Sequence, residues 1–355
     1  MFTWRRSLVA AIVVLGGLTL ALWLAPSGQY LLLPDEAQPV DPLVAVEGEG
    51  ADGNQADGTQ AAPGGGGIFM VDILVRKANL LERLFPRINE GADLIAEERI
   101  NPQGVSEQQR RQSNRLDMTR SQQIAAAVAL QHLGYDVNVQ SSGAEISLVL
   151  PGSPAAQAGL RPGDVILEAE GQPVKSPDEL RDAFADVQPG DQVTVAVQRS
   201  GGQKDYTLTT RASDEDPERA VIGVVVQQAA SINLPIDIDI DAGAIGGPSA
   251  GLAFALDIID ELGGDIDQGR RIVVTGELAL DGSVQPVGGI EQKVIGAERA
   301  GADIMVVPIG NAREAQAHAS DDLAIVPVAT FDEALRDLNW RSGAPPPTDS
   351  GPSTG

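Results

Sequence analysis

Hydrophobic and polar positions divide the chain into segments with different periodicities. An uncharged, mostly apolar run extends over residues 7–25 and directly follows Arg5 and Arg6. A run of about 20 such residues is long enough to cross a bilayer as a helix, and a basic flank favours the cytoplasmic side. The pattern therefore predicts a cytoplasmic stub over residues 1–6 and a transmembrane anchor over residues 7–25. A cleaved signal peptide is the alternative, but Trp23 at the far end and the lack of an Ala-x-Ala site favour the anchor.

Composition changes after this run. Residues 47–67 are rich in Gly, Ala and Asp and cannot bury a core, so a flexible tether is predicted over residues 26–67. A short apolar piece, YLLLP, precedes the Gly-rich part and could pack back onto the folded part. Residues 68–132 contain one apolar strand and an Ala-rich helix ending near Gly134, which predicts an α/β adaptor region without evident chemistry. Residues 342–355 have the composition of a disordered tail.

Short alternating strands separated by Gly and Pro turns occupy residues 133–212, together with one capped helix starting near Ser176. The run GSPAAQAGLRPGDVILEAEGQPV, residues 152–174, resembles a PDZ domain of the bacterial kind. The resemblance implies a β-barrel or β-sandwich module whose groove binds the C-terminal tail of a peptide. A groove that is occluded by neighbouring parts of the chain is the alternative.

The same resemblance implies which residues form that groove. Backbone N–H groups of Leu133, Gly134 and Tyr135 would bind the terminal carboxylate of the peptide. The strand over residues 135–139 would pair with the peptide as an added strand, and the helix over residues 178–187 would form the other wall.

An acidic linker is predicted over residues 213–219, and the chain returns to an α/β pattern over residues 220–341. In this part Asp237, Asp239 and Asp241 alternate with isoleucines. A calcium loop is one interpretation, but Pro248 stands where such a loop needs its twelfth ligand, Glu. An edge strand with a wet face fits the alternation better.

Charge and composition exclude several classes of function. The formal net charge of −25 argues against nucleic acid as a partner, because phosphate binding needs clustered Lys and Arg. The chain has no cysteine, so disulfides, thiol nucleophiles and Cys-ligated zinc are excluded. Only His132 and His318 are present, which disfavours a histidine triad or a multi-histidine metal site. Neither a metal nor another cofactor is expected.

The stretch IGGPSAGLAFAL presents Ser249 behind Gly247 and Pro248, at the start of an apolar helix. The glycines allow a tight backbone path and the proline stiffens it, while the N-terminus of the helix directs N–H groups toward a developing oxyanion. A serine hydroxyl is a weak nucleophile unless a base accepts its proton. Gly247 to Gly251 also fit the G-x-S-x-G pattern, so an esterase that uses His318 stays a minor alternative.

Lys293 is the other candidate base. It is the only lysine after the PDZ-like module and lies beside the apolar side of a predicted helix. Burial would lower its pKa from about 10.4, because a low-dielectric site disfavours the ammonium.

Three motifs in order, GGPSAG, TGELALDGSVQPVGGIEQK and AGADIMVVP, resemble the proteolytic domain of the Lon family of Ser–Lys peptidases. The resemblance runs from about Ile222 to Val328 and implies that Ser249 is the nucleophile, Lys293 the general base, and Thr275 the residue that orients the lysine. The implied fold is a multidomain α+β chain, with a transmembrane helix, a PDZ-like module and a Lon-type α/β domain. As a whole, the chain resembles the membrane-anchored, PDZ-containing peptidases of that family.

Two departures from the family pattern change the expectation. Many Lon proteases have an aspartate three residues before the serine, where this chain has Gly246, which leaves the resting charge of the lysine open. No G-x-x-x-x-G-K-[ST] loop occurs in these 355 residues, so no ATP-driven motor is expected within them.

The expected function is therefore an anchored, ATP-independent serine endopeptidase that cleaves unfolded or flexible polypeptides outside the cytoplasm. Expected partners are polypeptide substrates, C-terminal tails and, through the N-terminal helix, the cell membrane; the sequence leaves homo-oligomers open. The PDZ-like module could recruit substrates or hold the peptidase inactive. A non-catalytic PDZ scaffold with an inactive Lon-like fold is the alternative from another class.

Overall fold

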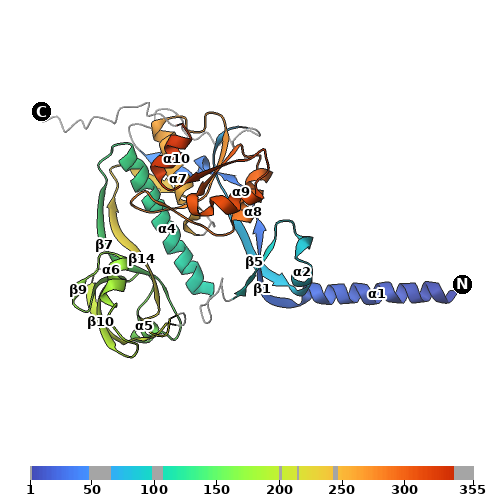
Figure 1. The fold of residues 1–355 in the computed structure, drawn as a ribbon, viewed down its shortest axis with the longest axis horizontal. Helices are drawn as coiled ribbons and strands as arrows, with labels where there is room; N and C mark the ends of the chain where they lie inside the picture. Colours follow the sequence, from blue (N-terminus) through green and yellow to red (C-terminus); the bar gives the residue numbers. More distant parts are fainter. Residues whose placement is uncertain are drawn as a thin grey trace.

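The computed structural model describes residues 2–47, 65–97, 107–199, 202–213, 216–242 and 247–339. Figure 1 shows a projecting N-terminal helix, an α/β body at the top and a smaller β-rich module below it. A long helix, α4 (Glu107–His132), and two long strands, β7 (Asn138–Val149) and β14 (Val224–Asn233), run between the body and the module. The tail predicted over residues 342–355 lies outside the described residues.

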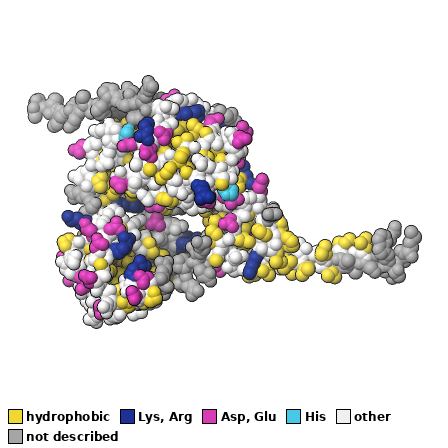
Figure 2. All heavy atoms as spheres, viewed as in Figure 1, with side chains coloured by type: hydrophobic (Ala, Val, Ile, Leu, Met, Phe, Trp, Pro, Cys, Tyr) yellow, Lys and Arg dark blue, Asp and Glu magenta, His cyan; other side chains and the backbone are white. Residues whose placement is uncertain are grey.

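The N-terminal helix α1 (Phe2–Leu24) coincides with the predicted membrane anchor. Its apolar side chains face solvent, with exposed fractions of 49% for Leu8, 70% for Val14 and 66% for Leu24, and Figure 2 shows hydrophobic side chains along it. Within the described part of the chain, however, no helix combines the length and the apolarity that crossing a membrane requires. The structure therefore does not support the predicted transmembrane helix.

The flexible tether predicted over residues 26–67 is wrong for most of its described part. Strand β1 (Pro26–Pro34) pairs antiparallel with β5 (Ile73–Asn79) and β6 (Asp93–Ala96), and it buries Leu31 completely. The Gly-rich composition is concentrated over residues 48–64, which lie outside the described residues, so it does not govern the apolar segment before them. Further short elements are α2 (Leu80–Leu84), η1 (Asp41–Leu43) and η2 (Pro86–Ile88).

The α/β body is built on a five-stranded sheet in the order β2-β4-β16-β19-β20. All neighbours are parallel except β2, which pairs antiparallel with β4 at one edge. Side chains alternate between two cores, so Ile272 and Val274 pack on one face and Val273 on the other, as expected for a sheet covered on both sides. The strands are β2 (Gln38–Pro39), β4 (Gly67–Met70), β16 (Arg271–Val274), β19 (Ile304–Pro308) and β20 (Ala324–Val328).

Helices cover both faces of this sheet. The C-terminal half of α4 packs with α7 (Gly251–Gly263) and α10 (Phe331–Asp337) on one face. Helices α8 (Ile290–Arg299) and α9 (Ala312–His318) cover the other, beside the short η4 (Ile309–Asn311). Residues 68–132 thus supply a central strand and a core helix of the body, so the separate adaptor region that was predicted is wrong.

Two short strand pairs complete the body. Strand β3 (Val44–Glu47) pairs antiparallel with β15 (Asp237–Ile240), whose Asp237 and Asp239 are exposed, as predicted for a strand with a wet face. Strands β17 (Glu277–Leu278) and β18 (Val284–Gln285) form a hairpin close to the start of α7.

The β-rich module contains a sheet in the order β11-β10-β8-β7-β14, with β9 beside β8. Its helix α6 (Pro177–Ala183) is capped by Ser176, whose side chain accepts a hydrogen bond from the N–H of Glu179, as the sequence predicts. Strand β14 follows the predicted acidic linker yet belongs to this sheet, so the sheet extends past residue 220. The other elements are α5 (Pro154–Ala158), β8 (Val165–Ala169), β9 (Gln172–Pro173), β10 (Gln192–Arg199), β11 (Gly202–Thr209), β12 (Arg211–Ala212) and β13 (Ala220–Val221).

Candidate active site

Ser249 lies in a tight turn at the N-terminal end of α7. Gly247 adopts a φ of 101° and a ψ of 155°, a conformation that L side chains rarely adopt, and the 3₁₀ turn η3 (Pro248–Ala250) follows it. The N–H of Gly276 donates to the carbonyl of Ser249 at 2.9 Å, which ties the serine to the end of β16. This arrangement agrees with the turn and helix predicted from the sequence around Ser249.

Lys293 reaches Ser249 from α8 on the other face of the sheet. Its side chain is only 2% exposed, and Nζ lies 3.0 Å from Ser249 Oγ and 2.8 Å from Thr275 Oγ1. Thr275 is fully buried directly after β16, and its Oγ1 also donates to the carbonyl of Ser249 at 3.4 Å. The structure therefore brings together the three residues that the sequence motifs single out, Ser249, Lys293 and Thr275.

Burial changes the charge state of the lysine. It lowers the pKa of Lys293 from 10.5 to about 8, because the ammonium loses its hydration, while the negative charge of Asp72 acts in the opposite direction. A lysine with a pKa of about 8 is partly neutral near physiological pH. It can therefore accept the proton of a neighbouring hydroxyl, which an ordinary surface lysine does not do.

Asp72 is a site residue that the sequence reasoning missed. It follows β4, whose Met70 pairs with Val274 of the parallel strand β16, so Asp72 and Thr275 both lie just past the carboxyl ends of neighbouring strands. One carboxylate oxygen of Asp72 accepts the N–H of Ile73 at 2.8 Å. Burial raises the pKa of Asp72, and the positive charge of Lys293 partly offsets this. The available signal was an apolar strand ending in aspartate, which is informative only once that strand is known to join the sheet.

The position three residues before Ser249 is where this chain departs from many Lon proteases. Gly246, which stands where many relatives of the predicted family carry an aspartate, lies outside the described residues. The carboxylate that acts on the lysine within the described part comes instead from Asp72, far upstream in the chain.

Neither histidine is the hydrogen-bond partner of Ser249. Nδ1 of His132 lies 3.1 Å from Asp332 Oδ1, and the ring packs edge-on against Phe331. Nδ1 of His318 lies 3.8 Å from Glu291 Oε1. These contacts place both rings in other surroundings, so the geometry favours the lysine-based site over the esterase alternative.

The predicted carboxylate-binding loop of the PDZ-like module is wrong. Gly134 ends α4 with a φ of 87°, its N–H donates to the carbonyl of Gln131, and the N–H of Tyr135 donates to Leu130. Leu133 packs against the core of the α/β body. The N–H groups of Gly134 and Tyr135 thus cap a helix and are not free for a peptide carboxylate.

The structure instead places a groove between α6 and the start of β14. It has a volume of about 810 Å³, and its lining includes Leu180 and Phe184 on one side and Ile222, Gly223 and Val224 on the other. The wall formed by α6 agrees with the predicted helix over residues 178–187. The prediction assigned the strand of the groove to residues 135–139, before the PDZ-like motif. The strand that lines the groove, β14, instead follows the acidic linker in sequence.

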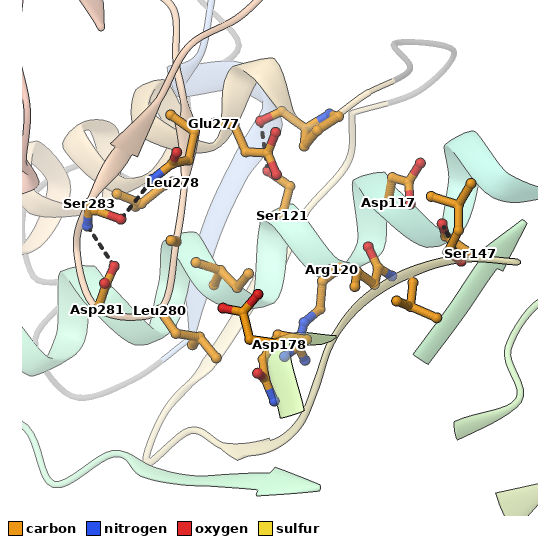
Figure 3. Close-up of a pocket in the computed structure, with 18 residues that line it drawn as sticks. Asp117, Arg120, Ser121, Ser147, Asp178, Glu277, Leu278, Leu280, Asp281 and Ser283 are labelled. Atoms are coloured by element: carbon orange, nitrogen blue, oxygen red, sulfur yellow. Dashed lines mark hydrogen bonds between the residues drawn. The ribbon is translucent and has the colours of Figure 1, made fainter. Parts of the chain in front are cut away.

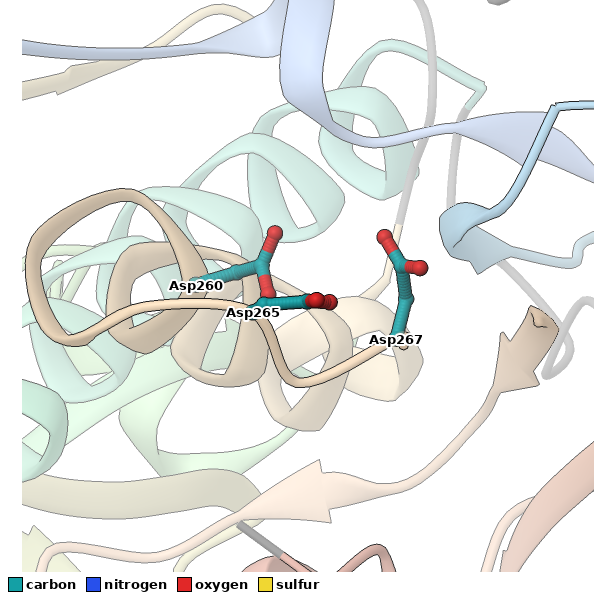
Figure 4. Close-up of side chains that lie close together, drawn as sticks. All are labelled: Asp260, Asp265 and Asp267. Atoms are coloured by element: carbon teal, nitrogen blue, oxygen red, sulfur yellow. The ribbon is translucent and has the colours of Figure 1, made fainter. Parts of the chain in front are cut away.

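The carboxylates of Asp260, near the end of α7, and of Asp265 and Asp267, in the connection from α7 to β16, lie within 4.8 Å of one another (Figure 4). Each accepts a backbone hydrogen bond within the same loop, from Ile266, Gln268 and Gly269 respectively. The acids therefore hold this loop in its turn conformation, away from the Ser249 site.

Comparisons with known protein families match two overlapping parts of the chain. A family model for the PDZ domain matches residues 145–199, and a model for the C-terminal proteolytic domain of Lon protease (S16) matches residues 190–339. The chain thus carries a PDZ domain and a Lon-type proteolytic domain.

Similar proteins include Lon protease 1 of Sorangium cellulosum, which is 34% identical over 43% of this chain and 21% of its own length. Lon protease of Roseiflexus castenholzii is 33% identical over 41% of this chain and 20% of its own length. The magnetosome formation protease MamE of Magnetospirillum gryphiswaldense is 40% identical over 23% of this chain and 11% of its own length. The chain thus spans about a fifth of the length of the Lon relatives it matches.

Proposed function

We propose that the protein is an ATP-independent serine endopeptidase with a Ser–Lys dyad, which cleaves unfolded or flexible polypeptides. The observation that carries this proposal is the buried Lys293 Nζ at 3.0 Å from Ser249 Oγ. A base at hydrogen-bond distance from a hydroxyl is the geometry that activates a serine nucleophile.

The chemistry follows from these positions. Neutral Lys293 accepts the proton as Ser249 Oγ attacks the substrate carbonyl carbon. The resulting ammonium donates that proton to the departing amine when the C–N bond breaks, which leaves an ester on Ser249. Lys293 then takes a proton from water, the hydroxide attacks the ester, and the proton returns to Ser249 Oγ. Thr275 holds Nζ in place throughout, because its Oγ1 lies 2.8 Å from it.

The substrate class rests on two features. No P-loop motif occurs in these 355 residues, so nothing within them would unfold a stable substrate. The groove between α6 and β14 has the two walls that a PDZ domain uses to hold an extended C-terminal tail, a helix and a strand. A bound tail raises the effective concentration of its polypeptide at Ser249.

We extend the proposal to location: α1 attaches the protein to a membrane, and both domains lie outside the cytoplasm. The exposed apolar side chains of α1 support membrane attachment, and Leu84, Phe85 and Ile88 beside its base are 59%, 57% and 59% exposed. Carbonate extraction of membranes and protease protection of the two domains test it. Release of the protein from membranes by carbonate contradicts the proposed attachment. Resistance of the two domains to protease added outside intact cells contradicts their proposed location. The oligomeric state is measured in the same preparations by light scattering.

The experiment that tests the activity uses the full chain, because residues 26–47 are part of the fold. An unfolded protein is incubated without ATP with the wild type, Ser249→Ala, Lys293→Ala and His318→Ala. We expect cleavage by the wild type and by His318→Ala alone. Equal activity in folded Lys293→Ala overturns the dyad, and loss in His318→Ala restores the esterase-type triad. Absence of cleavage by all four chains, with and without C-terminal peptides, favours the non-catalytic PDZ scaffold.

A further inference from the structure

A second cavity adjoins the PDZ groove along β14. It has a volume of about 670 Å³ and lies between α4, the Glu277–Gln285 hairpin and the PDZ-like sheet (Figure 3). Val225 and Val226 line both this cavity and the PDZ groove, and α6 also borders both. The two hollows therefore lie along the same strand and define a path past β14.

The outer edge of β14 is open along this path. The sheet ends at β14, which pairs with β7 on its inner side only, and no strand among the described residues pairs with its outer side. Val225 is 48% exposed. An open edge of this kind accepts an extended peptide as an additional strand.

Arg120 lies at this cavity with unused hydrogen-bond donors. The residue is only 7% exposed, and its Nη1 donates to the carbonyl of Ala230 in β14 at 2.9 Å. Its Nε and Nη2 are buried and have no hydrogen-bond partner among the described residues. Figure 3 shows the side chain extending from α4 toward Asp178. Buried guanidinium donors without acceptors are costly, so an acceptor supplied by a ligand would be bound favourably.

The other charges around the cavity decide which acceptor fits. Asp117, Asp178, Glu277 and Asp281 also line it, so a carboxylate would meet four acidic neighbours. Burial and the charges of Glu277 and Glu145 raise the pKa of Asp117 to about 6, which shows that negative charge is already crowded there. A neutral backbone carbonyl satisfies Arg120 without adding charge, and basic side chains of the same peptide would suit the acids.

The path reaches the residue before the proposed nucleophile. Pro248 lines the second cavity, and its carbonyl accepts a hydrogen bond from Ser121 of α4 at 3.3 Å. Ser249 is the next residue. A peptide that leaves the PDZ groove along β14 thus arrives at the start of α7, where the proposed attack takes place.

We propose that the C-terminal segment of a substrate lies along the open edge of β14, from the Gly223 turn to Ser249, with a backbone carbonyl on Arg120. This inference rests on the proposed peptidase function and adds a rule for where it cuts. Because the terminal carboxylate is held at one end and Ser249 stands at the other, cleavage occurs at a fixed number of residues from the C-terminus. One substrate residue pairs with each residue of Val224–Gln228, so the cut lies at least about five residues upstream.

The test uses the full-length enzyme and a flexible peptide of a repeated short sequence, in which equivalent bonds recur along the chain. Mass spectrometry locates the cuts. Adding two residues to the C-terminus should move the preferred cut by two residues, and C-terminal amidation should lower kcat/KM about tenfold. Cuts that stay at the same bonds after the extension overturn the fixed-distance rule. Cleavage that Ser249→Ala does not abolish contradicts the proposed function instead, so the two failures are distinguishable.

Arg120→Met tests the contact to the substrate. We expect kcat/KM to fall about tenfold for the long peptide, with cuts spread over several bonds, because a hydrogen bond to a charged donor is lost. A short peptide that ends a few residues after the scissile bond cannot reach the PDZ groove and should be cleaved as by the wild type. An equal loss for both peptides assigns Arg120 to folding alone and overturns its role as a substrate contact.

Discussion

The PDZ-like module and the proteolytic domain each bury a charged residue, but they treat it in opposite ways. Asp164 of the module is 1% exposed and forms a two-pronged ion pair with Arg199, at 2.5 and 2.6 Å. Lys293 of the proteolytic domain is 2% exposed and has two hydroxyl groups as its hydrogen-bond partners. The first arrangement neutralises the charge, whereas the second leaves the proton easy to remove. The two domains thus differ in that the buried carboxylate is ion-paired, whereas the buried lysine lies against the hydroxyl of Ser249.

The two cores also differ in how they are assembled. All buried residues of the module's core lie between Ala144 and Ile222. The core of the proteolytic domain that contains α7 collects residues from Val40 to Leu338. A contiguous core can be recognised from one stretch of sequence, but the second core includes segments that look like tether and adaptor when they are read alone.

The largest expected effect comes from exchanging the buried charge for an apolar side chain. Lys293→Met should lower peptidase activity at least about 10³-fold. The fall of the Lys293 pKa from 10.5 to about 8 corresponds to about 3 kcal/mol against the buried ammonium. Lost hydrogen bonds offset part of this, so the unfolding free energy at pH 7 should rise by about 1–2 kcal/mol.

The size of this gain in stability depends on pH. Burial lowers the folded-state pKa of Lys293, so its cost is fully present below about pH 8 and disappears as the pH rises toward 10.5. Denaturant titrations at several pH values measure it. In the matched variant, Asp164→Asn, stability should fall by about 3 kcal/mol, because Arg199 loses its counter-ion. If Lys293→Met is destabilised to the same extent at neutral pH, the contrast between the two buried charges is wrong.

Thr275→Val should lower kcat about 100-fold with a smaller change in KM. Valine has nearly the shape of threonine but no oxygen to accept from Lys293 Nζ, so the lysine loses its orientation. Steady-state kinetics on a flexible peptide measure this, and Thr210→Val in the module is the control. An unchanged kcat in Thr275→Val removes the positioning role.

Gly296→Ala tests the assembly of the proteolytic domain from distant segments. A Cβ at Gly296 would lie 2.1 Å from the carbonyl oxygen of Asp35, so the segment after β1 would have to move off α8. We expect a loss of about 3 kcal/mol in the stability of the proteolytic domain. In the module, Gly202→Ala should be nearly neutral, because the nearest atom among the described residues, the Arg199 carbonyl oxygen, lies 4.0 Å from a Cβ placed there. Thermal unfolding followed by limited proteolysis separates the two domains, and equal stability of the two variants would contradict the proposed packing.

The smallest effect should come from Asp72→Asn. The Asp72 charge raises the pKa of Lys293, so its removal lowers that pKa and moves the rise of activity with pH to lower pH. The rate at pH 7 should increase roughly two- to fivefold. Asp35→Asn, which removes a carboxylate that acts on Asp72, is the control. A pH–rate profile of Asp72→Asn that coincides with the wild type shows that Asp72 does not act on the lysine.

Ser249 was predictable from its glycine–proline turn and helix start, and Lys293 from its place beside the apolar side of a helix. Thr275 came only from the resemblance of its motif to the Lon family. Asp72 was not predictable in the same way, since its role depends on β4 pairing with β16, about 200 residues later in the chain. Leu133, Gly134 and Tyr135 were assigned to the groove because the strand that does form it, β14, lies beyond the linker. Strand pairing between distant segments leaves little local signal, since it is set by packing and register and not by propensity.

The chain between α1 and the segment that packs on α8 is short and consists mainly of strand β1. Strand β1 is nine residues long and begins two residues after α1 ends, and the carbonyl of Asp35 lies against Gly296, one turn after Lys293 on α8. A strand of this length spans about 30 Å. If α1 is held at a membrane, as proposed, the Ser249–Lys293 site is kept at a fixed distance from that membrane and reaches only polypeptides that lie close to it.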